Sequence, residues 1–257
     1  MNVCYRHPDR ETGVSCQRCD RYICPQCSTP GAVGFLCPED AKEKANIQRP
    51  SFQQTLSQRA PITMVLLGIN VFIFVANFFT GAINEELVYG NTGDGGSYST
   101  ALRAFTSGFA HGDVMHIAFN MYSLFVLGTL LEPFLGKLRF GLLYVLGIFG
   151  GIVAVKLLSP YGTFVLGASG AIFALMGAFL VVLRSQRMDT TQLLILIGLN
   201  VVMSFLPGIS WEAHIGGLVT GMAVAGLIVL LRQKQQQVIL YSALAVMGIA
   251  FVLFIGV

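Results

Sequence analysis

Seven long apolar stretches, separated by short polar gaps, dominate the hydrophobic pattern of this chain. They lie near 61–80, 114–135, 138–158, 164–183, 191–207, 211–231 and 238–257. Because an α-helix rises about 1.5 Å per residue, about 20 apolar residues cross the hydrocarbon layer of a bilayer. The pattern therefore predicts an all-α polytopic membrane protein with seven membrane-spanning helices.

The composition and the placement of basic residues agree with this prediction. Hydrophobic residues make up 54% of the 257 and charged residues only 11%, which excludes an ordinary soluble protein. Of the 16 Lys and Arg, all but Arg103 and Lys156 precede the first span or follow spans two, four and six. Since basic residues accumulate on the cytoplasmic side, we expect a cytoplasmic N-terminus and an external C-terminus. The expected location is the plasma (inner) membrane of a bacterium.

The first 45 residues predict a separate domain with a different chemistry. This segment holds all six cysteines, in four pairs with metal-ligand spacing: Cys4-x2-His7, Cys16-x2-Cys19, Cys24-x2-Cys27 and Cys37-x2-Asp40. In the reducing cytosol such pairs are typical of zinc sites rather than of disulfides. A segment this short has little core, so metal would supply much of its folding free energy. Four pairs predict two structural zinc ions.

The order of these ligands resembles a B-box zinc finger, although the last pair lacks the usual histidines. The resemblance implies alternating pairs, with one site made by Cys4, His7, Cys24 and Cys27 and the other by Cys16, Cys19, Cys37 and Asp40. Asp40 has a competing interpretation, because aspartate is also a favoured N-cap for a helix that starts at Ala41. Since basic and acidic residues are intermixed here, we expect a protein partner or a regulatory role, and no nucleic acid.

Two polar residues lie near the start of separate spans. Ser169 stands in Gly167-Ala168-Ser169-Gly170, and His214 stands in Ala213-His214-Ile215-Gly216-Gly217. With the N-terminus inside, spans four and six both start at the outer face, so the two side chains lie at similar depths, roughly 5–8 Å from the outer end. Both helices also carry small residues at four-residue spacing, which permits close contact. Alone, Ser169 could be packing material and His214 part of a proton or metal pathway; together they indicate a nucleophile and a base.

The second span supplies candidate hydrogen-bond donors. His116 and Asn120 are four residues apart and therefore share a face of the helix. Acyl transfer by a serine needs such donors where the carbonyl oxygen becomes negative. The backbone N–H of Ser169, in the first turn of its helix, is a third candidate. The alternative is that Asn120 only joins two helices.

Taken together, these residues resemble the rhomboid family of intramembrane serine proteases. The motifs that carry the resemblance are G-x-S-G around Ser169, A-H-x-x-G around His214, and H-x4-H-x3-N ending at Asn120. The resemblance implies a rhomboid-like core of six transmembrane helices, 61–231. The segment 46–60 would then be a linker from the 1–45 domain, and 238–257 an additional C-terminal transmembrane helix.

The resemblance also implies roles for individual residues. Ser169 corresponds to the nucleophile and His214 to the general base of a dyad without a carboxylate. His116, Asn120 and the Ser169 amide correspond to the oxyanion site. The supporting positions are His111, Phe173, Gly167, Gly170 and Gly217. Phe173 keeps the ring, but not the hydroxyl, of a tyrosine that often stacks on the catalytic histidine of the family.

Two acidic residues, Glu132 and Glu212, are not expected to take part in catalysis. The Glu-x-Arg often found at the inner end of span two reads Glu132-Pro133-Phe134 here, so no ion pair is expected. Glu212 is the nearest carboxylate to His214 in sequence, and we expect it to face the outer surface. The outer loop, 81–113, is too long for a bare connector, and the resemblance implies a partly helical segment in the outer interface.

The expected function is cleavage of single-pass transmembrane proteins within the lipid bilayer. The substrate helix would have to unwind locally, because a hydrogen-bonded helix hides its carbonyls. No cofactor is expected in catalysis. One alternative is a catalytically inactive rhomboid-like protein that binds membrane clients. Another is a transporter or channel that uses His116 and His214 as a relay, which predicts inverted repeats that are not evident in the sequence.

Overall fold

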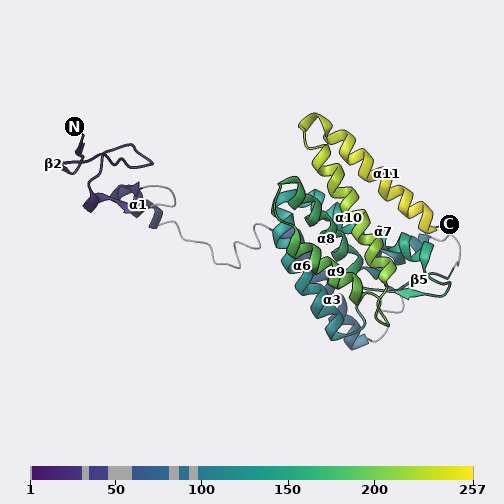
Figure 1. Ribbon diagram of the computed structural model, residues 1–257. Helices are drawn as coiled ribbons and strands as arrows, with labels where there is room; N and C mark the ends of the chain where they lie inside the picture. The colour runs from purple at the N-terminus through teal and green to yellow at the C-terminus, as the bar shows by residue number, and fades with distance from the viewer. Residues whose placement is uncertain (1, 31–34, 46–59, 81–86, 93–97, 257) are drawn as a thin grey trace. The chain divides into compact units, whose positions relative to one another are not determined.

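The computed structural model divides the chain into two compact units. It describes residues 2–30, 35–45, 60–80, 87–92 and 98–256. The units are Met1–Thr55 and Leu56–Val257, and Figure 1 draws the described part of the first in purple. The predicted linker, 46–60, lies almost entirely outside the described residues.

The N-terminal unit consists of two small hairpins and one short helix. Its elements are β1 (Val3–Cys4), β2 (His7–Glu11), the 3-10 turn η1 (Pro25–Cys27), β3 (Thr29–Pro30), β4 (Phe35–Leu36) and α1 (Pro38–Ala45). Strand β1 pairs antiparallel with β2, and β3 pairs with β4. Among the described residues of this unit, five of the seven buried apolar side chains are cysteines, and the other two are Ile23 and Leu36. Its interior is therefore made largely of sulfur.

The second unit is helical, which confirms the predicted all-α polytopic membrane protein. Its long helices are α3 (Pro61–Thr80), α6 (Val114–Leu135), α7 (Lys137–Leu158), α8 (Ser169–Ser185), α9 (Thr191–Met203), α10 (Trp211–Leu230) and α11 (Gln237–Gly256). Within the described part of the chain, five helices are long and apolar enough to cross a membrane: α3, α6, α7, α10 and α11. The remaining two, α8 and α9, are apolar but shorter, with 17 and 13 residues.

The fourth and fifth predicted spans extend beyond the helices that form there. The fourth was predicted to begin at 164, but Phe164–Val165 form β6, which pairs antiparallel with β5 (Tyr89–Gly90). The helix α8 therefore begins only at Ser169. The fifth was predicted to reach 207, but α9 ends at Met203, ahead of a turn that contains Pro207, a residue with no backbone N–H to continue a helix.

Helices α8 and α10 pack with their backbones in contact, as their small residues predict. A Cβ added to Gly217 on α10 would lie 2.0 Å from the carbonyl oxygen of Gly170 on α8. One added to Gly221 would lie 1.9 Å from the carbonyl oxygen of Ala174. No side chain fits in such a space, so glycine is required at both positions. The contact fixes the relative position of the two helix ends that carry Ser169 and His214.

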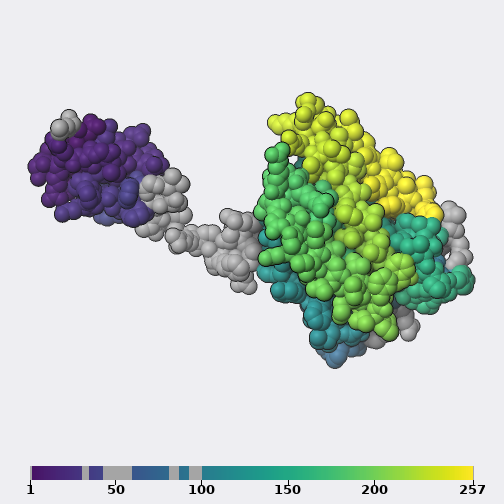
Figure 2. Space-filling view, viewed as in Figure 1, coloured from purple at the N-terminus to yellow at the C-terminus, as the bar shows by residue number. Residues whose placement is uncertain are grey.

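The C-terminal helix α11 is attached to α7 near both of its ends. Arg139 Nη2 on α7 donates a hydrogen bond to Gln237 Oε1 at 2.6 Å. Lys156 Nζ donates to the backbone carbonyls of Phe254 and Ile255 at 3.0 and 3.1 Å. Because the last carbonyls of a helix attract cations, Lys156 stabilises the end of α11. This contact gives a structural reason for Lys156, one of the two basic residues that lie outside the predicted cytoplasmic segments. Figure 2 shows α11, in yellow, as a continuous part of the surface of this unit.

Glu132 on α6 holds the start of α3. Its carboxylate accepts hydrogen bonds from the backbone N–H groups of Ile62 and Thr63 at 2.8 and 2.7 Å, and from Thr63 Oγ1 at 2.8 Å. Free N–H groups at a helix start favour an anion, so buried Glu132 has partners without any arginine.

The described part of the outer loop is partly helical. Helix α5 (Tyr98–Ser107) follows β5 and packs against β5, α7 and α11. The buried residues that join them are Tyr89, Ala104, Ile152, Val155, Val165 and Ile255. This cluster supports the antiparallel pair of β5 and β6, and β6 leads into α8.

Candidate active site and metal-binding clusters

Ser169 is the first residue of α8 and follows a turn that requires glycine. Gly167 has φ +123°, and its N–H donates to the carbonyl of Ser107 at 2.8 Å. A Cβ on Gly167 would lie 2.6 Å from His116 Nε2. Both the backbone conformation and the available space therefore exclude a larger residue. The turn places partly exposed Ser169 at the positive end of the helix dipole.

His214 on α10 lies against the same end of α8. Its ring stacks on Phe173, with ring centroids 4.1 Å apart and planes 13° apart. Phe173 is one helical turn after Ser169 and shares its face. The residue next to Ser169, Gly170, contacts Gly217, which is one turn after His214. The structure thus stacks His214 on Phe173 and places the start of α8, which carries Ser169, next to the start of α10.

A hydroxyl other than that of Ser169 contacts this histidine. Ser204 Oγ lies 2.5 Å from His214 Nδ1. Ser204 follows α9 directly, and both side chains are buried, with 2% and 8% exposed. Ser204 was not among the site residues predicted from the sequence. The available signal was a polar residue at the end of an apolar helix, joined to His214 by a short loop.

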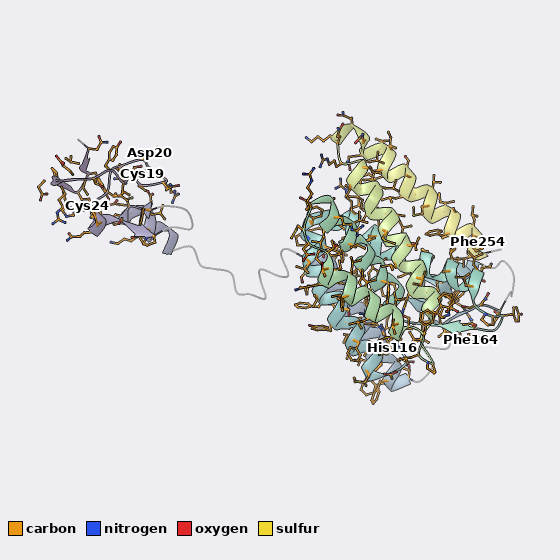
Figure 3. The ribbon with its side chains drawn as sticks, viewed as in Figure 1. Cys19, Asp20, Cys24, His116, Phe164 and Phe254 are labelled. Carbon is orange, nitrogen blue, oxygen red and sulfur yellow. The ribbon has the colours of Figure 1, made fainter. Side chains whose placement is uncertain are left out.

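The predicted oxyanion residues line the other side of the Ser169 turn. Asp113 caps α6, since its Oδ1 accepts from the His116 backbone N–H at 2.9 Å, which orients the first turn of that helix. Asn120 Nδ2 donates to the carbonyl of His116 at 3.0 Å and lies 3.9 Å from the Cβ position of Gly167. Figure 3 shows His116 and Phe164 at the same end of the helical unit.

His111 is a neighbour of this group and is fully buried. Its ring centroid lies 5.0 Å from that of His116, in an edge-to-face arrangement. It therefore packs behind His116, as a flanking position would.

Glu212 differs from the prediction that it faces the outer surface. Its side chain is buried, with 8% exposed, and its carboxylate accepts a hydrogen bond from Ser210 Oγ at 3.0 Å. Ser210 also caps α10 by accepting from the Ala213 N–H. The helix start and the capping serine thus stabilise this carboxylate, and the expectation of an exposed position was wrong.

The N-terminal unit contains two clusters that can hold metal ions. The first consists of Cys4, His7, Cys24 and Cys27, and the second of Cys16, Cys19, Cys37 and Asp40. In each, the potential ligand atoms all lie within 4.8 Å of one another. The grouping is the alternating one that the B-box resemblance implies. Cys19 and Cys24, labelled in Figure 3, belong to different clusters.

The first cluster has the dimensions of a tetrahedral zinc site. His7 Nδ1 lies 3.7, 3.5 and 3.4 Å from the sulfurs of Cys4, Cys24 and Cys27. With Zn–S near ~2.3 Å and Zn–N near ~2.0–2.1 Å, a tetrahedral site has S···N edges of about 3.6 Å. The distances from His7 to the three sulfurs therefore fit a zinc ion.

The second cluster is tighter on its carboxylate side. The sulfurs of Cys19 and Cys37 are 3.8 Å apart, as in a tetrahedral thiolate pair. Asp40 Oδ2 lies only 3.1 Å from Cys16 Sγ and from Cys37 Sγ, whereas a zinc site needs roughly 3.5 Å. Helix α1 begins at Pro38, so Asp40 lies inside its first turn. It does not cap a helix that starts at Ala41.

The ionisable groups of the clusters have unequal proton affinities. Burial opposes ionisation of the Cys4 thiol, but backbone hydrogen bonds outweigh it and lower its pKa to about 6. Burial raises the pKa of Cys37 to about 12. Hydrogen bonds from Cys16 and Cys37 lower the pKa of Asp40 to about 2. Because a metal ligand must be deprotonated, metal binding here would release protons.

Comparison with known proteins finds rhomboid proteins that are similar to this chain. A family model described as the Rhomboid domain matches residues 98–232. Rhomboid protease GluP of Bacillus subtilis (strain 168) is 36% identical over 129 residues, which are 48% of this chain and 25% of that protein. YdcA of the same organism is 29% identical over 193 residues, 71% of this chain and 96% of that protein.

Plant proteins match over a similar length. RHOMBOID-like protein 6, mitochondrial, of Arabidopsis thaliana is 34% identical over 140 residues, 52% of this chain and 45% of that protein. The chain covers 34% of RHOMBOID-like protein 4 and 35% of RHOMBOID-like protein 1 from the same organism. It therefore spans between a third and a half of the length of these relatives.

Proposed function

Because this chain belongs to the rhomboid family, we propose that it is an intramembrane serine protease that cleaves transmembrane segments of single-pass membrane proteins. Ser169 is the nucleophile and His214 the general base of a dyad that opens to the outer side. The N-terminus is cytoplasmic and the C-terminus external, in the plasma membrane of a bacterium. The family membership supports the class of reaction, and the local geometry supports the choice of residues.

One observation carries the proposal: the start of α8, which carries Ser169, packs directly against the start of α10. The Phe173–His214 stack and the Gly170–Gly217 backbone contact both flank the serine. A nucleophile and a base must be held in register for proton transfer. Neither helix can shift past the other while these contacts are intact.

The chemistry needs only the chain's own groups and water. His214 Nε2 accepts the proton of the Ser169 hydroxyl as Oγ bonds to the substrate carbonyl carbon. The imidazolium then gives that proton to the amide nitrogen as the C–N bond breaks, which leaves an ester on Ser169. Water, deprotonated by the same imidazole, hydrolyses the ester and regenerates the hydroxyl.

The oxyanion of each tetrahedral intermediate needs donors on the side of the carbonyl oxygen. We assign this role to the Ser169 N–H, His116 and Asn120, which surround the Gly167 turn. Such donors act most strongly where water is excluded. Gly167 itself keeps the space beside His116 open.

The N-terminal unit completes the proposal as a zinc-binding, B-box-like domain with two structural ions. The near-tetrahedral distances around His7 support the first ion, and the donor set of the second cluster supports another. We assign this domain a protein partner or a regulatory role.

The test is reaction of the full-length protein in detergent with a fluorophosphonate probe, combined with cleavage of a single-pass test segment in lipid vesicles. Wild type should label and cleave. Ser169→Ala should abolish both, and His214→Ala should leave less than about a hundredth of the rate, because the base drives attack. Ser185→Ala, on the same helix but at its far end, is the matched control and should behave as wild type.

Two outcomes would contradict the proposal. Labelling that survives in Ser169→Ala would mean that another residue reacts. No cleavage by the wild type, together with retention of the test segment in co-purification, would instead support an inactive client-binding protein.

A further inference from the structure

We infer that Ser204 is a positioning residue that holds His214 in the tautomer needed for base catalysis. The inference rests on the proposed function, since a tautomer matters only if His214 accepts a proton. It concerns Nδ1, the ring nitrogen that does not accept the Ser169 proton in the proposed mechanism.

The hydroxyl of Ser204 has one proton and two close neighbours. Its Oγ lies 2.7 Å from the carbonyl oxygen of Asn200, one turn earlier, and 2.5 Å from His214 Nδ1. The carbonyl can only accept, whereas Nδ1 can donate or accept according to the tautomer. If Ser204 donates to Asn200, its lone pair faces Nδ1, which must then carry the proton.

That proton placement leaves Nε2 as the unprotonated nitrogen. In a neutral imidazole one nitrogen donates and the other accepts, and the partner of the first decides which is which. A base for the Ser169 hydroxyl needs the lone pair on Nε2. In serine proteases with a buried aspartate the carboxylate performs this orientation; here an uncharged hydroxyl, itself oriented by a backbone carbonyl, occupies the equivalent side of the ring.

The surroundings of Ser204 support a specific role. Within α9 only Leu193 and Ile197 are buried, so most of this helix is exposed, yet Ser204 at its C-terminal end has 2% of its surface exposed. A buried hydroxyl usually has a partner. This one has two, the Asn200 carbonyl and the His214 imidazole, and the second joins the end of the lightly packed α9 to α10.

The experiment compares Ser204→Val with Ser204→Thr in the full-length protein in lipid vesicles. The two side chains have nearly the same shape, so any cost of the added methyl is shared and only the hydroxyl differs. We expect kcat for a single-pass test segment to fall about tenfold in Ser204→Val relative to Ser204→Thr, the effect of one neutral hydrogen bond, with KM changed less than twofold. Ser185→Ala removes a serine that also donates to its own helix, to Val182, but contacts no histidine; it should leave both parameters unchanged.

The second readout is the 15N NMR spectrum of histidine-labelled protein, with the His214 signal assigned by its loss in His214→Gln. Wild type should show the proton on Nδ1, and Ser204→Val should show a mixture of tautomers. Equal kcat in the Val and Thr variants, or a wild-type proton on Nε2, would overturn the inference. If Ser169→Ala also retains activity, the proposed protease function itself has failed; if it abolishes activity, only the role of Ser204 has failed.

Discussion

In the described part of the N-terminal unit the buried side chains are mostly cysteines, whereas the helix ends that carry Ser169 and His214 meet at glycines that leave no side chain between the backbones. Both arrangements bring residues distant in the sequence to one point. The first does so through side-chain atoms that lie close enough together to hold one metal ion, and the second through helices with no side chain between them. The two regions should therefore fail in different ways: the first by loss of an ion, the second by gain of a methyl group.

Metal removal should give the largest effect. A strong chelator should unfold the 1–45 segment of the full-length protein and leave the helical unit intact, because structural zinc contributes about 10–16 kcal/mol of folding free energy in small domains. Limited proteolysis followed by mass spectrometry should show new cleavage between Cys4 and Cys37 and none within the membrane helices. Cys24→Ala, which removes a ligand of the first cluster, should reproduce the effect without chelator. Equal protection with and without chelator would mean that the cysteines form an ordinary apolar core.

Adding a side chain at the helix contact should give the next largest effect. In Gly221→Val the new Cβ would meet the Ala174 carbonyl at 1.9 Å, so α8 and α10 must separate. We expect the free energy of unfolding to fall by about 3 kcal/mol or more, at the upper end of the cost of overpacking. We also expect protease activity to be lost. Gly226→Val is the control on the same helix, since a Cβ there meets nothing within 4 Å. Thermal unfolding in detergent measures both, and similar behaviour of the two variants would show that the close contact is not needed.

Substitution of Asp40 should give the smallest effect. It tests whether the second cluster holds its metal ion less tightly than the first. Its oxygen lies closer to the sulfurs than a zinc site allows, so the second ion should bind less tightly than the first. We expect Asp40→Ala to speed loss of about one zinc per chain to a chromogenic chelator roughly tenfold, and Asp40→Cys to slow it, since closed structural sites are mostly built from Cys and His. One ion per chain in all three proteins, lost at one rate, would remove the second site from the proposal.

The membrane helices were predictable because their cause is local. A run of about 20 apolar residues must be helical in a bilayer, whatever surrounds it. The same reasoning placed the start of α8 five residues too early, since the pairing of Phe164 and Val165 with Tyr89 and Gly90 depends on a segment far away in the sequence. Local hydrophobicity does not distinguish a two-residue strand from the first turn of a helix.

The candidate site was predicted only in part, for a similar reason. Ser169, His214, His116 and Asn120 stand in recognisable motifs, and small-residue spacing indicated that two helices could approach closely. Glu212 was expected at the surface because a charged side chain in an apolar segment is usually exposed. The hydrogen bond from Ser210, which also caps α10, instead stabilises the carboxylate in a buried position. Ser204 is in no motif, and its contact with His214 depends on the path of the loop that connects α9 to α10.

The sequence by itself determined that this is a polytopic membrane protein, approximately where its long helices lie, and which ligand pairs stand in its first 40 residues. These properties follow from hydrophobic length and from spacing along the chain. Only the tertiary structure decided that Asp40 faces sulfur, that Lys156 stabilises the end of α11, and that Ser204, directly after α9, contacts Nδ1 of His214. Each of these depends on the distance between groups on different elements, which no periodicity within one element specifies.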